Sequence, residues 1–376
     1  MSQREVVLID AMRTPLGKPF GSLSRFASHD LAAAAITALL KRTGTNGETL
    51  DHTIFGQAHP STYPSNVGHY APLLARVPEK VPGYTVHANS ASGLQALRNA
   101  YYLVASENAD VCLAGGVDSY SAAPFVMRNI RRHFSPADRA IADTIDEAEC
   151  WTQPVPESRG ENYEKNYGLS LSPEALEFAL NTRRRGRTPD PELQQRIVPM
   201  AYQDRKKGTV TVTQDEWITG DDRVELLAPY ADGACAALLM DSRRAQALGL
   251  RPLLTLEGFC TAGTGPEQWQ MSGVKALQKL LSGRGLSLSQ LDCLEIQENS
   301  AADVLSMVRA LDIGPDSPAV NPGGGALSLG KNDGADGVIM LLSLALSLQR
   351  RGSGRGAVCI SSAGGLGMAL LARRRP

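Results

Sequence analysis

Continuous apolar runs alternate with helix-like segments along the first third of the chain. Residues 6–9 are uniformly apolar, which is typical of a strand buried on both faces, and residues 30–41 carry alanines and leucines at helical spacing. Alternating strands and helices indicate an α/β fold with largely parallel sheets. Further strands are predicted at 52–56, 84–87 and 110–114, and a further helix at 91–106.

Two parts of this pattern occur twice. Residues 5–15 resemble residues 252–262, both in their apolar run and in the turn that closes it. Ser92-Gly93, the helix that follows and the run 111–116 resemble Asp336-Gly337, a helix and the run 358–360. The repeats predict a duplicated α/β unit, with an active site where the two halves meet.

Residues 121–227 differ from the rest, because they are rich in charge and proline and lack buried-strand runs. Their one clear helical stretch is 172–184, where Ser172 supplies an N-cap and Pro173 the first-turn proline. We therefore expect an N-terminal half of residues 1–120 plus 228–250, an inserted loop domain of residues 121–227 and a C-terminal half of residues 251–376. The insertion either covers the core near the site or is only a solvated subdomain.

Charge and cysteine usage exclude several classes of protein. The 38 Lys and Arg nearly balance the 39 Asp and Glu, so no global field attracts nucleic acid or an anionic membrane. The six cysteines include no CxxC pair, so they are expected to be reduced, and no metal site is expected. No signal-peptide pattern begins the chain, and the apolar run 338–348 is too short to span a bilayer. A cytoplasmic protein of 376 residues is expected.

Six short blocks, in order along the chain, resemble motifs of the thiolase superfamily. The nucleophile turn of that family, CASGLQA, is matched by Ser90-Ala-Ser-Gly-Leu-Gln-Ala, and its opening ARTPIGK turn by the segment from Ala11 to Lys18. The resemblance implies the thiolase fold, in which duplicated α/β halves form an αβαβα layered core. The other four blocks are 114–121, 160–170, 295–302 and 321–330.

Serine stands at position 90, where the family has its nucleophilic cysteine. Ser90 precedes a predicted helix start, so it would lie at the positive end of a helix dipole, although it could also simply cap that helix. A hydroxyl is not ionised near neutral pH and needs an adjacent base for attack. One cysteine-to-serine replacement would explain position 90, but not the changes at other family positions.

The histidine of the family's GHP motif is also absent, since Gly330-Lys331-Asn332 stands there. Lys331 could act as the base of a Ser–Lys pair, or it could be a plain cation or a surface residue. His59 is the other candidate base, because it falls where the family chain enters the site; a structural role is the alternative.

The remaining family positions have changed as well. Gln297 stands where the family has an asparagine that holds a catalytic water, and a longer amide could still serve. The second family cysteine is matched by Cys359 or by Ser361, depending on the direction of counting. Backbone N–H groups of Ser90, Ala363 and Gly364 are candidate oxyanion donors.

These residues favour a divergent thiolase-like acyltransferase that uses a coenzyme A or carrier-protein thioester as substrate and binds no cofactor permanently. The alternative is a catalytically silent subunit or acyl-CoA-binding protein that supports an active partner. A homodimer, a homotetramer or a hetero-oligomer with an active homologue is expected, since family members pair across a sheet edge. Arg183, Arg184, Arg185 and Arg187 could meet coenzyme A phosphates or form a solvated helix face.

Overall fold

The computed structural model describes residues 4–61, 63–127, 141–145, 172–188, 190–219, 224 and 226–375. The motif block at 160–170 and Cys150 lie outside the described residues. Among the described helices, none is both long and apolar enough to cross a membrane.

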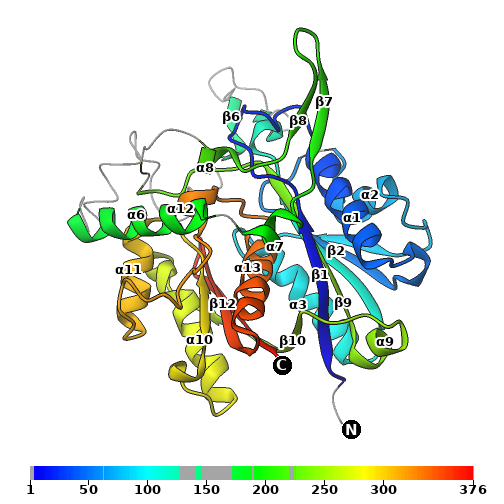
Figure 1. Ribbon diagram of the computed structural model, residues 1–376. Coiled ribbons are helices and arrows are strands. Elements are labelled where there is room, and N and C mark those ends of the chain that lie inside the picture. The colour runs from blue at the N-terminus through cyan, green and yellow to red at the C-terminus, as the bar shows by residue number, and fades with distance from the viewer. Residues whose placement is uncertain are drawn as a thin grey trace, which may run out of the picture.

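A nine-stranded mixed sheet, with the strand order β11-β12-β13-β10-β1-β9-β4-β2-β3, runs through the molecule (Figure 1). It joins two halves at the antiparallel pair β1–β10. The strands of the first half are β1 (Val6–Arg13), β2 (His52–Gly56), β3 (Gly83–Val86), β4 (Val111–Asp118) and β9 (Gly233–Asp241). Those of the second half are β10 (Leu254–Gly263), β11 (Cys293–Ile296), β12 (Gly354–Ser362) and β13 (Leu366–Arg374).

Both halves pair their strands in the same order and sense. In the first half β2 lies parallel to β3 and β4, and β9 lies antiparallel to β4 and β1. In the second half β11 lies parallel to β12, and β13 lies antiparallel to β12 and β10. In the second half, Val320 forms a parallel bridge with Leu294 of β11, and it thereby occupies the edge position that β3 occupies beside β2 in the first half. The predicted duplication of the α/β unit is confirmed, but the prediction of largely parallel strands is wrong, because five of the eight strand pairs of this sheet are antiparallel.

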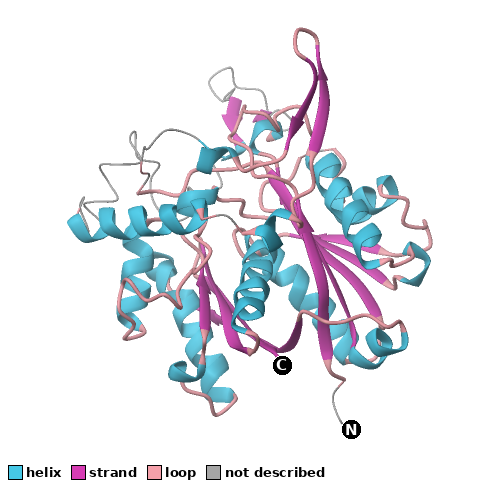
Figure 2. Ribbon diagram, in the orientation of Figure 1, coloured by secondary structure: helices cyan, strands magenta, loops and turns pink. Residues whose placement is uncertain are grey.

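The helices form three layers around the two halves of the sheet (Figure 2). Helices α1 and α2 cover the outer face of the first half, and α10 and α11 cover that of the second. Helices α3 and α13 lie between these halves, so the expected αβαβα core is confirmed. The helices of the two halves are α1 (Ser28–Thr43), α2 (Val67–Leu74), α3 (Ser92–Ala105), α9 (Ser242–Ala247), α10 (Ser272–Gly283), α11 (Ala301–Ala310), α12 (Ala326–Leu329) and α13 (Asp336–Arg351).

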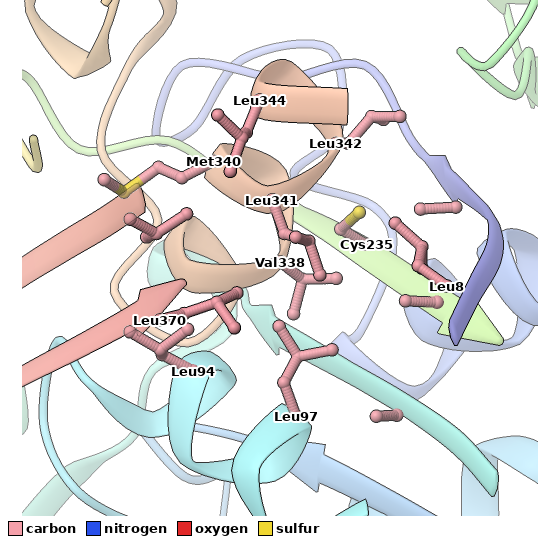
Figure 3. Packing of buried hydrophobic residues seen from close by; sticks show 14 of the residues in the cluster. Leu8, Leu94, Leu97, Cys235, Val338, Met340, Leu341, Leu342, Leu344 and Leu370 are labelled. Atoms are coloured by element: carbon pink, nitrogen blue, oxygen red, sulfur yellow. The ribbon is translucent and has the colours of Figure 1, made fainter. Parts of the chain in front are cut away.

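Apolar side chains fill the space between α3 and α13. Leu94 and Leu97 of α3 point toward Val338 and Leu341 of α13, and all four are fully buried (Figure 3). Leu8 of β1 and Cys235 of β9 close the cluster on the side of the first half. The run 338–348 is largely apolar and buried because α13 packs against α3 and against strands of both halves of the sheet.

The two central helices cross at glycines that occupy matching places in the duplicated halves. A Cβ atom at Gly337 would lie 2.5 Å from the backbone nitrogen of Leu94, and one at Gly93 would lie 2.5 Å from the carbonyl oxygen of Gly334. Only hydrogen fits at these positions, so the two helices approach backbone to backbone.

Replacement of Gly337 by alanine is expected to force α3 and α13 apart and to lower the free energy of unfolding by about 1–3 kcal/mol. Urea denaturation followed by circular dichroism measures this effect. Gly283→Ala, at the end of α10, has nothing within 4 Å of the new Cβ and is the matched control. Equal stability of the two variants would contradict the close crossing.

The segment between the halves packs over one end of the sheet. Helix α6 (Pro173–Arg187) begins after Ser172, whose hydroxyl accepts a bond from the Ala175 N–H, so the predicted capped helix is confirmed. The hairpin of β7 (Met200–Asp204) and β8 (Gly208–Val212) projects away from the two chain termini (Figure 1). The other short elements are β5 (Phe125–Met127), β6 (Ile141–Asp143), α7 (Pro191–Gln194) and α8 (Glu216–Thr219).

Candidate active site

Ser90 lies in the tight turn that joins β3 to α3, and its own side chain does not cap the helix. The Ser92 hydroxyl holds the turn instead, since it donates to the Asn89 carbonyl at 2.6 Å and accepts from the Ala88 N–H at 2.9 Å. Asn89 has a φ of 48°, in the left-handed region, which bends the chain toward the helix. Ser90 is 6% exposed, and its hydroxyl faces the Asp333 carboxylate, whose pKa it helps to lower. The capping alternative for Ser90 is therefore wrong.

Asp333, in the loop before α13, is the centre of a polar cluster formed by Ser90, His59, Tyr120, Lys331 and Asp333. Its carboxylate accepts a bond from the Tyr120 hydroxyl at 2.9 Å and lies 3.1 Å from Lys331 Nζ and 3.5 Å from His59 Nε2. Burial alone would raise the pKa of Asp333, but Lys331, His59 and Ser90 hold this pKa far below its ordinary value. Asp333 is therefore ionised in the folded protein near neutral pH.

The two candidate bases both face this anion. Burial lowers the pKa of His59, but its bond to Asp333 and the charges of Asp118 and Asp333 outweigh burial and raise it above 6.5. The ammonium of Lys331 forms an ion pair with Asp333, which stabilises its protonated form. The structure thus brings Ser90, His59 and Lys331 together, with Asp333 between them, as a cationic pair around a carboxylate.

Aromatic rings line the cluster on one side. The Tyr120 ring stacks on Tyr230 with centroids 4.3 Å apart, and the His59 ring lies 4.7 Å from Tyr120. Lys331 Nζ lies 5.7 Å above the Tyr230 ring. These rings form one wall of the cluster around Asp333.

A second carboxylate, Asp118 at the end of β4, fixes the backbone of the site. It accepts the His59 N–H at 2.8 Å and the Gly334 N–H at 2.7 Å, so it ties the segment after β2 to the loop before α13. Burial raises the pKa of Asp118 to about 6, against the effect of the His59 charge. The Asn332 amide strengthens the same junction, because it donates to the Asp118, Ala231 and Gly233 carbonyls at 3.0, 2.7 and 3.1 Å.

Gln297 lies beneath the loop of Lys331 and Asp333, where it supports the loop from below. Its amide donates to Asp336 at 2.9 Å, and Asp336 also accepts the Asn332 N–H at 2.9 Å. Burial, together with the charge of Asp333, raises the pKa of Asp336 to about 7. A small cavity of about 30 Å³ next to Gln297 is lined by Glu295, Glu298 and Asp336.

Cys359 and Ser361, the two candidates near the end of β12, have different surroundings. Cys359 is fully buried in the cluster against α10 and α11, where burial raises the pKa of its thiol to about 12. Ser361 is bonded to the start of α10, since it donates to the Gln270 carbonyl at 2.6 Å and accepts the Gly273 N–H at 3.0 Å. Both side chains thus serve packing between β12 and the outer helices.

The turn at Ala363 and Gly364 lies against the nucleophile turn. Asn89 Nδ2 donates to the Ala363 carbonyl at 3.3 Å, and the Ser362 hydroxyl donates to the Ala88 carbonyl at 3.1 Å. The structure therefore brings the two expected oxyanion segments together, one from each half of the molecule.

Three acidic or phenolic residues of the site were missed from the sequence. Asp118 ends the buried strand β4, Tyr120 follows it, and Asp333 stands two residues after Lys331 in the loop before α13. A signal was present for all three, because polar side chains just beyond the carboxyl ends of buried strands and just before helices gather at one edge of an α/β sheet.

The arginines of α6 are largely engaged within the protein. Arg185 donates to the Val320 carbonyl at 2.6 Å and Arg187 to the Ile218 carbonyl at 3.1 Å, while Arg183 is 7% exposed. Arg184 is exposed and bonds Asn181 at 3.1 Å. Contact of these residues with coenzyme A phosphates stays a prediction. No group of three metal-ligating side chains is found within the described residues.

Glu295 gives the site a pH-dependent stability. Burial and the nearby Glu298 raise its pKa from 4.5 to about 8, so the folded chain holds a proton that the unfolded chain releases. Stability is therefore lost as pH rises from 4.5 through about 8. We expect Glu295→Gln to raise the free energy of unfolding at pH 8 by about 1–3 kcal/mol and to have little effect near pH 5.

Urea denaturation at the two pH values tests this expectation. Glu267→Gln changes an exposed carboxylate and is the matched control. A gain of stability that is the same at both pH values would contradict a raised pKa of Glu295.

The chain is similar to known proteins over almost its whole length. Residues 6–242 match the family described as Thiolase, N-terminal domain, and residues 250–374 match Thiolase, C-terminal domain. An acetyl-CoA acetyltransferase of Chromobacterium violaceum is 30% identical over 98% of this chain and 100% of that protein. A beta-ketoadipyl-CoA thiolase of Pseudomonas aeruginosa is 32% identical over 99% of both proteins. The solved human mitochondrial 3-ketoacyl-CoA thiolase superposes with a TM-score of 0.90 at 25% identity, covering 99% of both chains.

Proposed function

Since the chain belongs to the thiolase family, we propose that it is an acyltransferase that carries its acyl group on the hydroxyl of Ser90. The donor is a coenzyme A or carrier-protein thioester. The observation that supports this proposal is the Asp333 carboxylate, which lies 3.5 Å from His59 Nε2 and 3.1 Å from Lys331 Nζ and whose pKa the Ser90 hydroxyl helps to lower. A nucleophile, a proton acceptor and a proton donor thus lie in one buried cluster.

Acyl transfer to Ser90 proceeds by addition and elimination at the thioester carbon. The Ser90 oxygen forms a bond to that carbon while its proton passes to Asp333. The carbon–sulfur bond then breaks, and the imidazolium of His59 gives a proton to the leaving sulfur. The proton on Asp333 passes to His59, whose Nε2 lies 3.5 Å from the carboxylate, which restores both groups. Backbone N–H groups of Ser90 and of the Ala363-Gly364 turn would stabilise the oxyanion.

One observation favours the silent-subunit alternative. Lys331 forms an ion pair with Asp333, and the Asp333 carboxylate has a strongly lowered pKa, so Ser90 faces a weak base. A hydroxyl beside such a base attacks slowly. Under this alternative the chain would bind an acyl thioester and support an active partner without transferring the acyl group.

Intact-mass measurement after incubation with acetyl-CoA separates the two functions. The acyltransferase proposal expects a mass gain of one acetyl group that is absent in Ser90→Ala, and a faster gain in Ser90→Cys. An ester on Ser90 resists neutral hydroxylamine, whereas the thioester on the cysteine variant is cleaved by it. A folded protein that gains no mass in either the unmodified or the Ser90→Cys form would support the silent subunit.

We further propose that the chain forms a homodimer or homotetramer, or pairs with an active homologue, through the sheet edge at β3. This strand ends the sheet and leads directly into the turn of Ser90. Light scattering on the purified chain tests this proposal, and Thr85→Pro on that edge is expected to reduce the assembly to monomers.

A further inference from the structure

A second cavity, here called the distal cavity, lies at the end of the sheet away from Ser90. Its volume is about 350 Å³, and its walls come from the start of β1, the start of β10, the end of β13 and the end of α10. Tyr101 of α3 forms part of it, whereas Ser90 precedes the first turn of that helix, about 15 Å away along its axis. Both chain termini lie on this side of the molecule (Figure 1).

Arginine dominates the lining of the distal cavity. The carboxylate of Glu257 is shared between Arg355 at 2.7 Å and Arg373 at 3.1 Å, and Glu5 pairs with Arg375 at 3.1 Å. Arg4 is paired with Asp110 and Asp241 outside the cavity lining. Five arginines but only two carboxylates line the cavity: Arg4, Arg284, Arg355, Arg373, Arg375, Glu5 and Glu257.

Neither Glu5 nor Glu257 forms an ion pair with Arg284. Its guanidinium lies in the same lining as Tyr101, whose pKa its charge acts to lower, and no carboxylate of the described residues lies within ion-pair distance of it. The chain is shaped to admit this group, since a Cβ atom at Gly258 would lie 2.5 Å from Arg284 Nη2. Gly258 has a φ of 151° and stands at a register shift of β10, so the strand is bent away from the guanidinium.

The floor of the distal cavity is rigid and mainly apolar. Tyr101 is 4% exposed and packs against Phe259 with ring centroids 5.2 Å apart. Leu256, Leu286 and Leu371 complete the apolar lining. A ligand held by the arginines would therefore rest on a fixed surface with one phenol hydroxyl beside Arg284.

We infer that the distal cavity binds a small ligand that carries at least two phosphoryl groups. Guanidinium groups bind phosphate oxygens through paired N–H donors, and several of them around one cavity favour a multivalent anion. A volume of about 350 Å³ fits a small molecule. The ligand would contact Arg284 first, with Arg355 and Arg375 at the rim.

The distal cavity lies between the two halves of the molecule, so a bound anion would contact both of them. β1 belongs to the first half and β10 and β13 to the second, so one ligand would hold both halves together across their seam. Binding to the folded chain alone would stabilise it by mass action. The inference stands apart from the proposed chemistry at Ser90, because it shares no residue with that site.

Inorganic pyrophosphate is the probe, titrated into the full chain at constant ionic strength and followed by calorimetry and thermal unfolding. One saturable site and a Tm that rises with pyrophosphate are expected. Arg284→Gln and Arg375→Gln should each raise the dissociation constant for pyrophosphate at least tenfold, since each variant loses a charge-assisted bond to the ligand. Arg205→Gln, in the exposed turn between β7 and β8, should bind as the unmodified chain does.

Three results would overturn the inference. They are the absence of saturable binding, unchanged binding in a folded Arg284→Gln variant, and citrate binding as tightly as pyrophosphate, which would show a site for carboxylates. Near-ultraviolet circular dichroism establishes that each variant is folded. Unchanged acylation of Ser90 in Arg284→Gln would show that any lost binding is not at the active site.

Discussion

Asp333→Asn is expected to slow acylation of Ser90 by about 10²–10⁴-fold, the usual contribution of a positioned acid or base. The amide keeps the shape of the side chain but cannot accept the proton of Ser90. It also removes the negative charge that Lys331, at 3.1 Å, and His59, at 3.5 Å, now share. Two buried cations would then face each other without a counter-ion, and the pKa of His59 should fall.

Single-turnover mass spectrometry with acetyl-CoA measures the rate, and proton NMR of the imidazole follows the pKa of His59. Tyr120→Phe is the matched control, because it removes a 2.9 Å hydrogen bond to the same carboxylate but leaves its charge. Its effect on the rate should be much smaller. Equal rates for Asp333→Asn and the unmodified chain would exclude Asp333 as the proton acceptor.

Arg13→Met is expected to lower the free energy of unfolding by about 3–5 kcal/mol, because it leaves a buried carboxylate without its cation. Arg13 lies at the end of β1, is 1% exposed and binds both oxygens of Asp215, at 2.6 and 2.7 Å. Burial would lower the pKa of Arg13, but Asp215 more than offsets this and raises it. Asp215 also accepts the Leu16 N–H at 2.8 Å.

Urea denaturation of the Arg13→Met variant tests this value. The double variant Arg13→Met, Asp215→Leu should recover part of the loss, since no buried charge remains. Lys80→Met breaks an ion pair with Glu48 in which both side chains are more than half exposed, and it should cost less than about 1 kcal/mol. A loss in Arg13→Met no larger than that of Lys80→Met would contradict the role of the buried pair.

The periodic parts of the fold could be predicted from the sequence because each depends on neighbours along the chain. The uniformly apolar runs at β1 and β4 marked strands buried on both faces, and the repeated Ser92-Gly93 and Asp336-Gly337 marked the two central helices. The match in strand order of the two halves depends on pairing between distant segments. A weak pattern repeat could suggest this order but could not specify it.

The site was predictable only in part, for a related reason. Ser90, His59 and Lys331 stood out as residue types that do chemistry at positions of a resembled motif. Asp333 did not, because its importance comes from the three groups that meet it from β4, the segment after β2 and the turn before α3. Nor could the sequence show that the Cys359 side chain lies against the outer helices, since one residue of register decides which face a strand side chain occupies.

The glycine crossing of α3 and α13 separates the framework of this molecule from its chemistry. Close contacts at Gly93 and Gly337 set the distance between the starts of the two helices, and neither contact involves the side chain of Ser90 or Asp333. Ser90 and Asp333 precede these starts, so their side chains can be exchanged while their Cα positions stay in place. The framework therefore does not depend on which side chains form the site, so serine, lysine and aspartate could replace another catalytic set without a change of fold.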